Sequence, residues 1–269
     1  MKNFLTKAYK FSNSWTGTIF IVLFVIFFIA QAFRIPSGSM KDSLLVGDHL
    51  FAKKFAYGIS MPHIPFLEVS IMPWSDKLRL FDGDKPKHGD IVIFRYPKNI
   101  KQHFVKRCVA IPGDELFVAN KNLFLHFKEG NDWIKKHYKG FEIAQYDDKL
   151  WVKNPYMKAH RGIHHDKNVV NDGRYPMPLF FVNPLKVEKN HYFMMGDNRD
   201  HSNDSRFWGQ VPYDNIEGTP WFIYFSVDKN WEIRWDRIGK TPTDLEQSPY
   251  LDNAIKGRIQ EDKKQHGIT

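Results

Sequence analysis

The fold is decided by residues 104–111, FVKRCVAI, which the turn Pro112-Gly113-Asp114 follows directly. A short run of β-branched and aromatic residues that ends at a Pro-Gly turn is typical of a β-strand. Further outward, comparable short runs occur at 49–52, 91–96, 179–182, 191–195 and 220–226. Outside the N-terminal region, no long segment has the 3.6-residue period of a helix. The sequence therefore predicts a mainly β protein with an antiparallel or mixed sheet.

The strand-like runs also suggest a division of the chain. Residues 34–114 and 191–240 are predicted to form one β domain. Residues 115–190 are more polar and irregular, and we expect them to form a smaller inserted lobe. From Thr241 the chain is charged and punctuated by proline, so 241–269 is predicted to be a polar C-terminal tail, either frayed or forming a short surface helix.

An apolar segment lies close to the N-terminus. Residues 19–30 read IFIVLFVIFFIA, and with their flanks they extend to a run of 18 uncharged residues, 16–33. As a helix this run would be roughly 27 Å long, just enough to cross the hydrocarbon core of a bilayer. Residues 1–15 carry three lysines and no acidic residue, which favours a cytoplasmic N-terminus. A cleavable signal peptide is the alternative, since Ala30-Gln31-Ala32 fits a small-x-small cut, but the length of the run favours a transmembrane anchor.

Net charge and cysteine content limit the partners and the kinds of site that the protein could have. A net charge of +9 admits nucleic acid, an anionic membrane surface or acidic substrates as partners. The charges are spread along the chain rather than gathered in one basic run, so we expect no nucleic-acid partner. The single cysteine, Cys108, excludes an intrachain disulfide and a C-x-x-C site. The histidines His160, His164 and His165 lack a matched fourth ligand and are interpreted as a solvated loop, so we expect no metal and no cofactor.

A candidate nucleophile follows the apolar segment. Residues 35–40 read Ile-Pro-Ser-Gly-Ser-Met, and Pro36 and Gly38 bracket Ser37 in a turn that can expose the hydroxyl of Ser39. On this stretch alone an ordinary Ser/Gly turn is the better interpretation. A serine nucleophile would also need a base to act at neutral pH.

Lys106 is the candidate base. Strand alternation places it on one face with Phe104, Cys108 and Ala110, while Arg107 points to the opposite face. Lysine shifts its pKa readily when it is desolvated, whereas arginine does not usefully lose its proton. Lowering a lysine pKa to near 7 takes roughly 4–5 kcal/mol, which burial can supply. The alternative is that the ammonium reaches solvent along its own aliphatic stem.

A third segment, 196–212, reads GDNRDHSNDSRFWGQVP and is dense in acidic and basic side chains. A calcium-binding loop is excluded, because the position that requires glycine is Ser205 and the position that requires glutamate is Val211. The segment predicts a rigid polar loop held by Asp–Arg pairs, in which a serine could hydrogen-bond a neutral lysine and orient it.

Together these segments resemble the type I signal peptidase family. The matching pieces are Pro36-Ser37-Gly38-Ser39-Met40 after an apolar segment, Gly89-Asp90 before the strand 91–94, Lys106-Arg107 with Pro112-Gly113-Asp114, and Gly196-Asp197-Asn198-Arg199-Asp200 continuing through Ser202, Asp204, Ser205 and Arg206. The resemblance covers roughly 30–115 and 190–240. In one departure, this chain has Asp42-Ser43 where the family usually has Pro-Thr.

The resemblance implies a membrane-bound serine endopeptidase with a signal-peptidase β fold. Such an enzyme removes signal peptides from exported preproteins by a Ser-Lys dyad, and it cuts after small residues in an A-x-A pattern. By position, Ser39 would be the nucleophile and Lys106 the general base, while the Ser37 hydroxyl and the Ser39 backbone N–H would form the oxyanion hole. The orienting and supporting residues would be Ser202, Gly196, Asp204 and Arg206. The residues that would line pockets for an extended, strand-like substrate are Ile35, Pro36, Met40, Leu44, Phe104 and Val105.

The resemblance also implies a place in the cell. The chain would be a single-pass protein of the inner, cytoplasmic membrane of a bacterium, with the catalytic domain on the outer, periplasmic face. Its partners would be signal peptides and the lipid bilayer, with no obligate protein partner. One alternative is a self-cleaving repressor-type Ser-Lys protease, which would carry a helix-turn-helix in place of the anchor. The other is a membrane-tethered, non-catalytic basic and aromatic module that binds lipid or protein.

Overall fold

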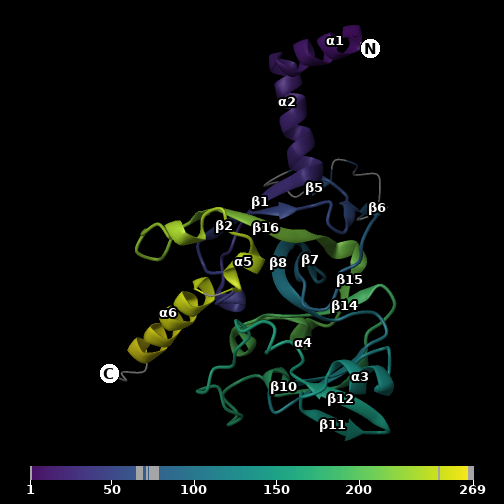
Figure 1. Cartoon of the computed structure of the whole chain (residues 1–269), viewed down its shortest axis with the longest axis vertical. Helices are drawn as coiled ribbons and strands as arrows, with labels where there is room; N and C mark the ends of the chain where they lie inside the picture. The colour runs from purple at the N-terminus through teal and green to yellow at the C-terminus, as the bar shows by residue number, and fades with distance from the viewer. Residues whose placement is uncertain (1, 65–68, 71, 73–78, 248, 266–269) are drawn as a thin grey trace.

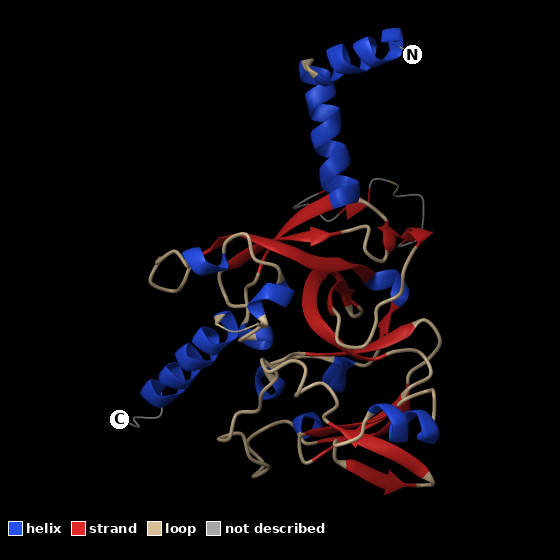
Figure 2. Ribbon diagram, viewed as in Figure 1, coloured by secondary structure: helices blue, strands red, loops and turns tan. Residues whose placement is uncertain are grey.

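The protein is described by a computed structural model that covers residues 2–64, 69–70, 72, 79–247 and 249–265. Figure 1 shows an N-terminal helical arm, a body built on β-sheets and a C-terminal helix beside that body. The ribbon in Figure 2 shows that strands dominate the body. The mainly β fold predicted from the sequence is therefore confirmed.

The apolar N-terminal segment is helical only as far as Ile29. Its helical elements are α1 (Lys2–Ser12), α2 (Trp15–Phe24) and a π-helical turn (Val25–Ile29). At Ala30 the backbone becomes extended, because strand β1 (Ala30–Arg34) pairs with strand β2 (Asp48–Lys53) of the main sheet. The expected helix over 16–33 is therefore wrong at its C-terminal end. In the described part of the chain, no helix combines the length and the apolar character that crossing a membrane requires.

A seven-stranded antiparallel sheet forms the larger part of the body. In hydrogen-bonding order its strands are β1, β2, β16 (Ile216–Ser226), β7 (Ile91–Tyr96), β8 (Asn99–Ala110), β14 (His191–Met195) and β15 (Val211–Pro212). The predicted strands 91–96 and 191–195 are confirmed at those bounds. Most of the run 104–111 lies in β8, where Lys106 is the register partner of Val92 on β7.

Strand β8 is covered on both faces over its second half. Residues from Lys106 to Ala110 are all buried, including two adjacent cations. Cys108 packs in a cluster with Val92 and Met194, whereas Val109 packs in a different cluster. Burial raises the pKa of the Cys108 thiol. A strand that is buried on both faces has a mostly apolar sequence. This strand could therefore be predicted from the sequence.

The second sheet is built from residues between β8 and β14. In hydrogen-bonding order its strands are β11 (Ile143–Tyr146), β12 (Lys149–Lys153), β10 (Asn122–His126), β9 (Glu115–Ala119) and β13 (Phe181–Lys186), with helix α3 (Asn131–His137) beside β12. The irregular structure expected for 115–190 is wrong, because alternate residues of the β9–β10 hairpin such as Leu116 and Leu123 are fully buried. They share a cluster with Val109 and Phe193 of the main sheet, so the two sheets have a common hydrophobic core.

Shorter elements complete the described part of the chain. Two short antiparallel pairs are formed by β3 (Gly58–Ser60) with β6 (Arg79–Asp82) and by β4 (His63–Ile64) with β5 (Val69–Ser70). Helix α4 (Ser205–Trp208) is a single turn. The 3-10 turns are Gly38–Met40, Met177–Leu179, Arg199–His201, Tyr213–Asn215 and Trp235–Arg237.

The C-terminal residues form two helices, α5 (Pro242–Leu245) and α6 (Tyr250–Gln265). Thr241 and Asp244 make a capping box that starts α5. Leu245 and Leu251 are fully buried. Of the two alternatives for the tail, the frayed one is therefore wrong, because apolar side chains anchor these helices to the body.

Candidate active site

Ser39 lies in the 3-10 turn Gly38–Met40, between β1 and β2, and only 7% of the residue is exposed. The turn is bound from one side by Asn198, which follows β14. The Asn198 backbone N–H donates to the Ser39 carbonyl oxygen over 3.1 Å, and its side-chain amide donates to the Gly38 carbonyl oxygen over 3.1 Å. These two bonds fix the backbone of the turn while the Ser39 hydroxyl remains available for other contacts.

The side chain of Lys106 reaches the Ser39 hydroxyl. Its Nζ lies 2.6 Å from Ser39 Oγ and also donates to the Val105 carbonyl oxygen over 3.1 Å. Burial lowers the pKa of Lys106 to about 8, although the nearby carboxylate of Asp204 opposes this shift. The resemblance implies that Ser202 orients this amine through a hydrogen bond, but in the described structure Ser202 Oγ makes no hydrogen bond to Lys106. The amine is oriented by the nucleophile and its own strand instead.

Ser37 lies beside the nucleophile. Its hydroxyl is 3.4 Å from the Ser39 hydroxyl, and the residue is exposed in extended backbone just before the turn. A hydroxyl with this freedom can rotate to donate to an oxygen that develops negative charge next to Ser39.

The residues expected to line substrate pockets surround the turn and strand β8. Four of them pack in one hydrophobic cluster, Ile35, Met40, Leu44 and Val105. Phe104 packs in the neighbouring cluster, and its ring centre lies 5.3 Å from Lys106 Nζ. Pro36 is exposed. Apolar side chains thus enclose both reactive groups.

Gly196 begins the loop that packs against the nucleophile turn. A Cβ atom at this position would lie 2.5 Å from the Ser39 carbonyl oxygen and would also clash with Ser202 Oγ, so the close approach requires glycine. The Gly196 N–H donates to Asp204 over 3.0 Å, and Asp204 pairs with Arg206 over 2.8 Å. The predicted Asp–Arg pair is therefore present, and it fixes the position of the glycine.

Sequence reasoning missed an ion pair behind the base. Arg107 follows Lys106 on β8, points to the opposite face and binds Asp197 through two contacts of 2.8 and 2.7 Å. Arg107 also donates to the Gly89 carbonyl oxygen over 2.7 Å, and the Ser43 hydroxyl donates to Asp197 over 2.5 Å. Strand alternation was the available signal for a second buried cation, but nothing local identifies its partner.

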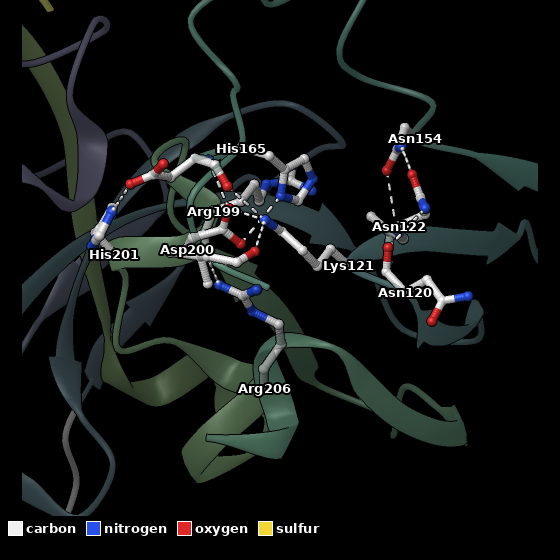
Figure 3. Close-up of polar contacts among 12 residues, drawn as sticks. Asn120, Lys121, Asn122, Asn154, His165, Arg199, Asp200, His201 and Arg206 are labelled. Atoms are coloured by element: carbon white, nitrogen blue, oxygen red, sulfur yellow. Dashed lines mark hydrogen bonds and ion pairs between the residues drawn. The ribbon is translucent and has the colours of Figure 1, made fainter. Parts of the chain in front are cut away.

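The second sheet contacts the same loop through Asp200, as Figure 3 shows. Lys121, from the turn between β9 and β10, lies 2.6 Å from the Asp200 carboxylate, and His165 Nδ1 lies 3.3 Å from it. The interpretation of His160, His164 and His165 as a solvated loop is therefore wrong, because all three are partly buried and lie near carboxylates. No group of three potential metal ligands occurs among the residues that the structure describes.

The chain is similar to known proteins over most of its length. Residues 9–225 match the family model described as "Signal peptidase, peptidase S26". The chain is 43% identical to "Signal peptidase I" of Helicobacter pylori strain J99 in an alignment that covers 91% of this chain and 96% of that protein. It is 41% identical to "Signal peptidase I" of Helicobacter pylori strain 26695, covering 93% and 99% of the two chains. It is 34% identical to "Signal peptidase I" of Pseudomonas fluorescens, covering 81% and 72%.

Proposed function

The chain belongs to the signal peptidase family, peptidase S26, and is a serine endopeptidase that removes signal peptides; we propose that Ser39 and Lys106 are its catalytic dyad. The observation that carries this proposal is the 2.6 Å separation of Lys106 Nζ and Ser39 Oγ inside a site where Lys106 is only 4% exposed. Among the described residues, the Ser39 hydroxyl has contacts with Lys106 and Ser37 and none with a histidine.

The low pKa makes the amine usable as a base. With a pKa of about 8, about one tenth of the Lys106 side chains are neutral at pH 7, compared with roughly 3 in 10⁴ for a lysine of ordinary pKa. A base whose pKa lies near the working pH combines an available neutral form with sufficient basicity. Burial therefore increases the reactive population by about two orders of magnitude.

The reaction proceeds in two halves. In the first, neutral Lys106 Nζ accepts the proton of the Ser39 hydroxyl while Oγ bonds to the carbonyl carbon of the scissile peptide. The carbonyl electron pair moves onto oxygen, where the Ser37 hydroxyl and the Ser39 N–H donate hydrogen bonds. The Lys106 ammonium then protonates the leaving amine as the C–N bond breaks. In the second half, neutral Lys106 accepts a proton from water as the water oxygen bonds to the acyl carbon, and the Lys106 ammonium then protonates Ser39 Oγ as the bond between Oγ and the acyl carbon breaks.

Substrate specificity follows from the apolar lining of the site. Ile35, Met40 and Leu44 are buried together in one cluster next to the nucleophile turn, and such close packing favours small substrate side chains beside Ser39. We therefore assign cleavage after an A-x-A pattern in an extended substrate. Replacing the alanine directly before the cut by leucine should block cleavage of a preprotein, and unchanged cleavage would contradict this assignment.

The N-terminal arm supports attachment to a membrane. Apolar side chains from Ile19 to Val25 are 36–63% exposed, an apolar surface that lipid would cover favourably. We assign the N-terminus to the cytoplasm and the β body to the periplasmic face of a bacterial inner membrane. The full chain should remain in the membrane fraction after a carbonate wash, and its recovery in the supernatant would contradict the assignment.

Preprotein cleavage in detergent tests the dyad. Ser39→Ala and Lys106→Ala should each lower the rate by at least about 10³-fold, because each removes one half of a concerted unit. Lys101→Ala is the matched control, since Lys101 lies on the same strand but is exposed. Circular dichroism should show that all three variants fold. Full processing by Lys106→Ala would contradict the dyad and favour a different base or a non-catalytic binding role.

A further inference from the structure

A buried carboxylate lies three residues after the nucleophile. Asp42 is 0% exposed and adopts left-handed backbone, with φ of 78°. Consecutive turns join it to Ser39, because the Lys41 N–H donates to Gly38 and the Leu44 N–H donates to the Met40 carbonyl oxygen over 2.7 Å. A displacement of Asp42 would therefore be transmitted to the nucleophile. Asp42 also stands where the sequence departs from the pattern Ser-Met-x-Pro-Thr.

In the part of the chain that the structure describes, a cation from the C-terminal helix lies beside this carboxylate. Arg258 Nε, on α6, lies 2.8 Å from Asp42 Oδ2. His164 Nδ1 is 3.5 Å from the same oxygen, but it also lies 2.7 Å from the Gly162 carbonyl oxygen, and burial lowers the pKa of this imidazole. His164 is therefore mostly neutral at neutral pH, so Arg258 supplies a permanent positive charge beside Asp42, with a further contribution from Lys41. Burial still raises the pKa of Asp42, so its charged form depends on these cations. A buried carboxylate is strongly destabilising when no cation compensates it.

The same C-terminal segment contacts the strand that carries the base. Glu246, which follows α5, forms an ion pair with Arg107 and lies 2.9 Å from His160 Nδ1. Arg107 is the neighbour of Lys106 on β8, and its Nη2 donates to both Glu246 and Asp197. One segment of chain thus reaches both the turn of the nucleophile and the strand of the base.

Apolar and surface contacts fix this segment in place. Leu245 belongs to the hydrophobic cluster that contains Met40 and Leu44, the residues on either side of the Asp42 turn. On α6, Asp252 pairs with Arg161 over 2.9 Å. Figure 1 shows α5 against the body and α6 extending away from it along one side. The segment is therefore anchored independently of its contact with Asp42.

We propose that residues 242–247 and 249–258 are a positioning element of the active site, in which Arg258 holds the Asp42 turn behind Ser39 and Glu246 holds Arg107 behind Lys106. The proposal rests on the Ser39–Lys106 dyad proposed above. Neither Glu246 nor Arg258 touches the reacting atoms; both act through the residues that they pair with. Small displacements of a nucleophile cost large factors in rate, so a loss at Arg258 should appear mainly in kcat.

Arg258→Ala in the full-length enzyme is the central variant. We expect it to lower kcat for a preprotein by about tenfold or more with KM within about twofold, since the nucleophile moves while the substrate pockets remain. Amide hydrogen exchange over 39–48 should become faster. Arg258→Lys should retain most of the rate, because an ammonium still supplies the counter-charge. Lys256→Ala, an exposed lysine on the same helix, is the matched control and should change neither measurement.

A second substitution separates positioning from general destabilisation. In the Arg258→Ala background, Asp42→Asn removes the carboxylate that needs a partner, and asparagine tolerates left-handed backbone. The double variant should recover kcat to within about threefold of the Asp42→Asn single variant. This comparison also keeps the test valid when Arg258→Ala alone does not fold.

Two results would overturn the proposal. One is an Arg258→Ala enzyme whose kcat and exchange over 39–48 match those of the Lys256→Ala control. The other is a double variant as impaired as Arg258→Ala, because the buried charge would then not be the cause. Failure of the dyad is distinguishable from both, since cleavage by Ser39→Ala would reject the dyad while the exchange measurement would still report whether Arg258 holds the turn.

Discussion

Replacing Lys106 with methionine should abolish cleavage and at the same time stabilise the fold. Burial lowers the pKa of Lys106 from its ordinary 10.5 to about 8. At about 1.4 kcal/mol per pH unit, this gap corresponds to about 3 kcal/mol by which the folded state disfavours the ammonium. Methionine has a similar length and no charge, so it removes that cost. It also removes hydrogen bonds to Ser39 and Val105, each contributing about 1 kcal/mol, which leaves a net gain of about 1 kcal/mol.

The pH dependence of this gain identifies its origin. Below pH 8 both the folded and the unfolded chain carry the ammonium, so the folded wild type bears the full cost. Between pH 8 and 10.5 the folded state loses its proton first and the cost declines with rising pH. The advantage of Lys106→Met should therefore be largest below pH 8 and should reach zero at about pH 9, where the remaining cost equals the two lost hydrogen bonds. By pH 10.5 the variant should be less stable than the wild type by about 2 kcal/mol.

Thermal unfolding in detergent, followed by circular dichroism, measures the effect, and preprotein cleavage is measured on the same samples. A gain of about 1 kcal/mol should raise the midpoint by about 2–4 °C for a chain of this size. Lys101→Met, on the exposed part of the same strand, should leave both activity and midpoint nearly unchanged. A Lys106→Met protein that is less stable than the wild type below pH 8, or that gains the same amount at all pH values, would refute the reasoning.

Three further outcomes test other parts of the site. For the wild type, kcat/KM should rise about tenfold from pH 7 to a plateau with a midpoint at the Lys106 pKa of about 8, and a rate that is flat over this range would exclude a titrating amine. Gly196→Ala should lower cleavage by about 10²-fold or more, because its Cβ would lie 2.5 Å from the nucleophile's carbonyl oxygen, whereas Gly257→Ala on α6 meets nothing within 4 Å and should leave cleavage unchanged. Glu217→Gln should destabilise the fold by about 3 kcal/mol at pH 7, because the hydrogen bond and charge of His103, followed by the charge of Arg95, outweigh burial and lower the pKa of Glu217 to about 2. That difference should shrink as pH falls from about 4.5 to about 2, and a destabilisation independent of pH in urea titrations would contradict it.

The parts of the fold that the sequence predicted well are strands with continuous apolar character. Residues 91–96 and 191–195 are nearly all buried, so their composition alone distinguishes them from turns. In β9 and β10 of the second sheet only alternate residues are buried, and polar residues at the strand ends, such as Glu115, Asn122 and His126, made 115–190 look irregular. The end of the N-terminal helix was also missed, because Ala30 to Phe33 are apolar in either structure and only pairing with β2 makes them a strand.

The candidate site likewise has features that the sequence predicted and contacts that it did not. The burial of Lys106 followed from alternation along one strand, which is local information. The contacts of Arg107 with Asp197 and of Asp42 with Arg258 join residues far apart in the sequence, and a single sequence holds no local sign of them. For the same reason the charged C-terminal residues looked like a solvated tail, although Glu246 and Arg258 pair with the buried residues Arg107 and Asp42.

The burial of the only thiol makes this protein convenient for spectroscopy. Cys108 is 0% exposed and its thiol has a raised pKa, so maleimide reagents should spare it while the protein is folded. A cysteine introduced at an exposed position such as Lys256 would then be the sole attachment point for a fluorophore or a spin label, without any need for a cysteine-free background. Slow labelling of Cys108 itself would report how often the core opens, even in detergent or lipid where optical unfolding signals are weak.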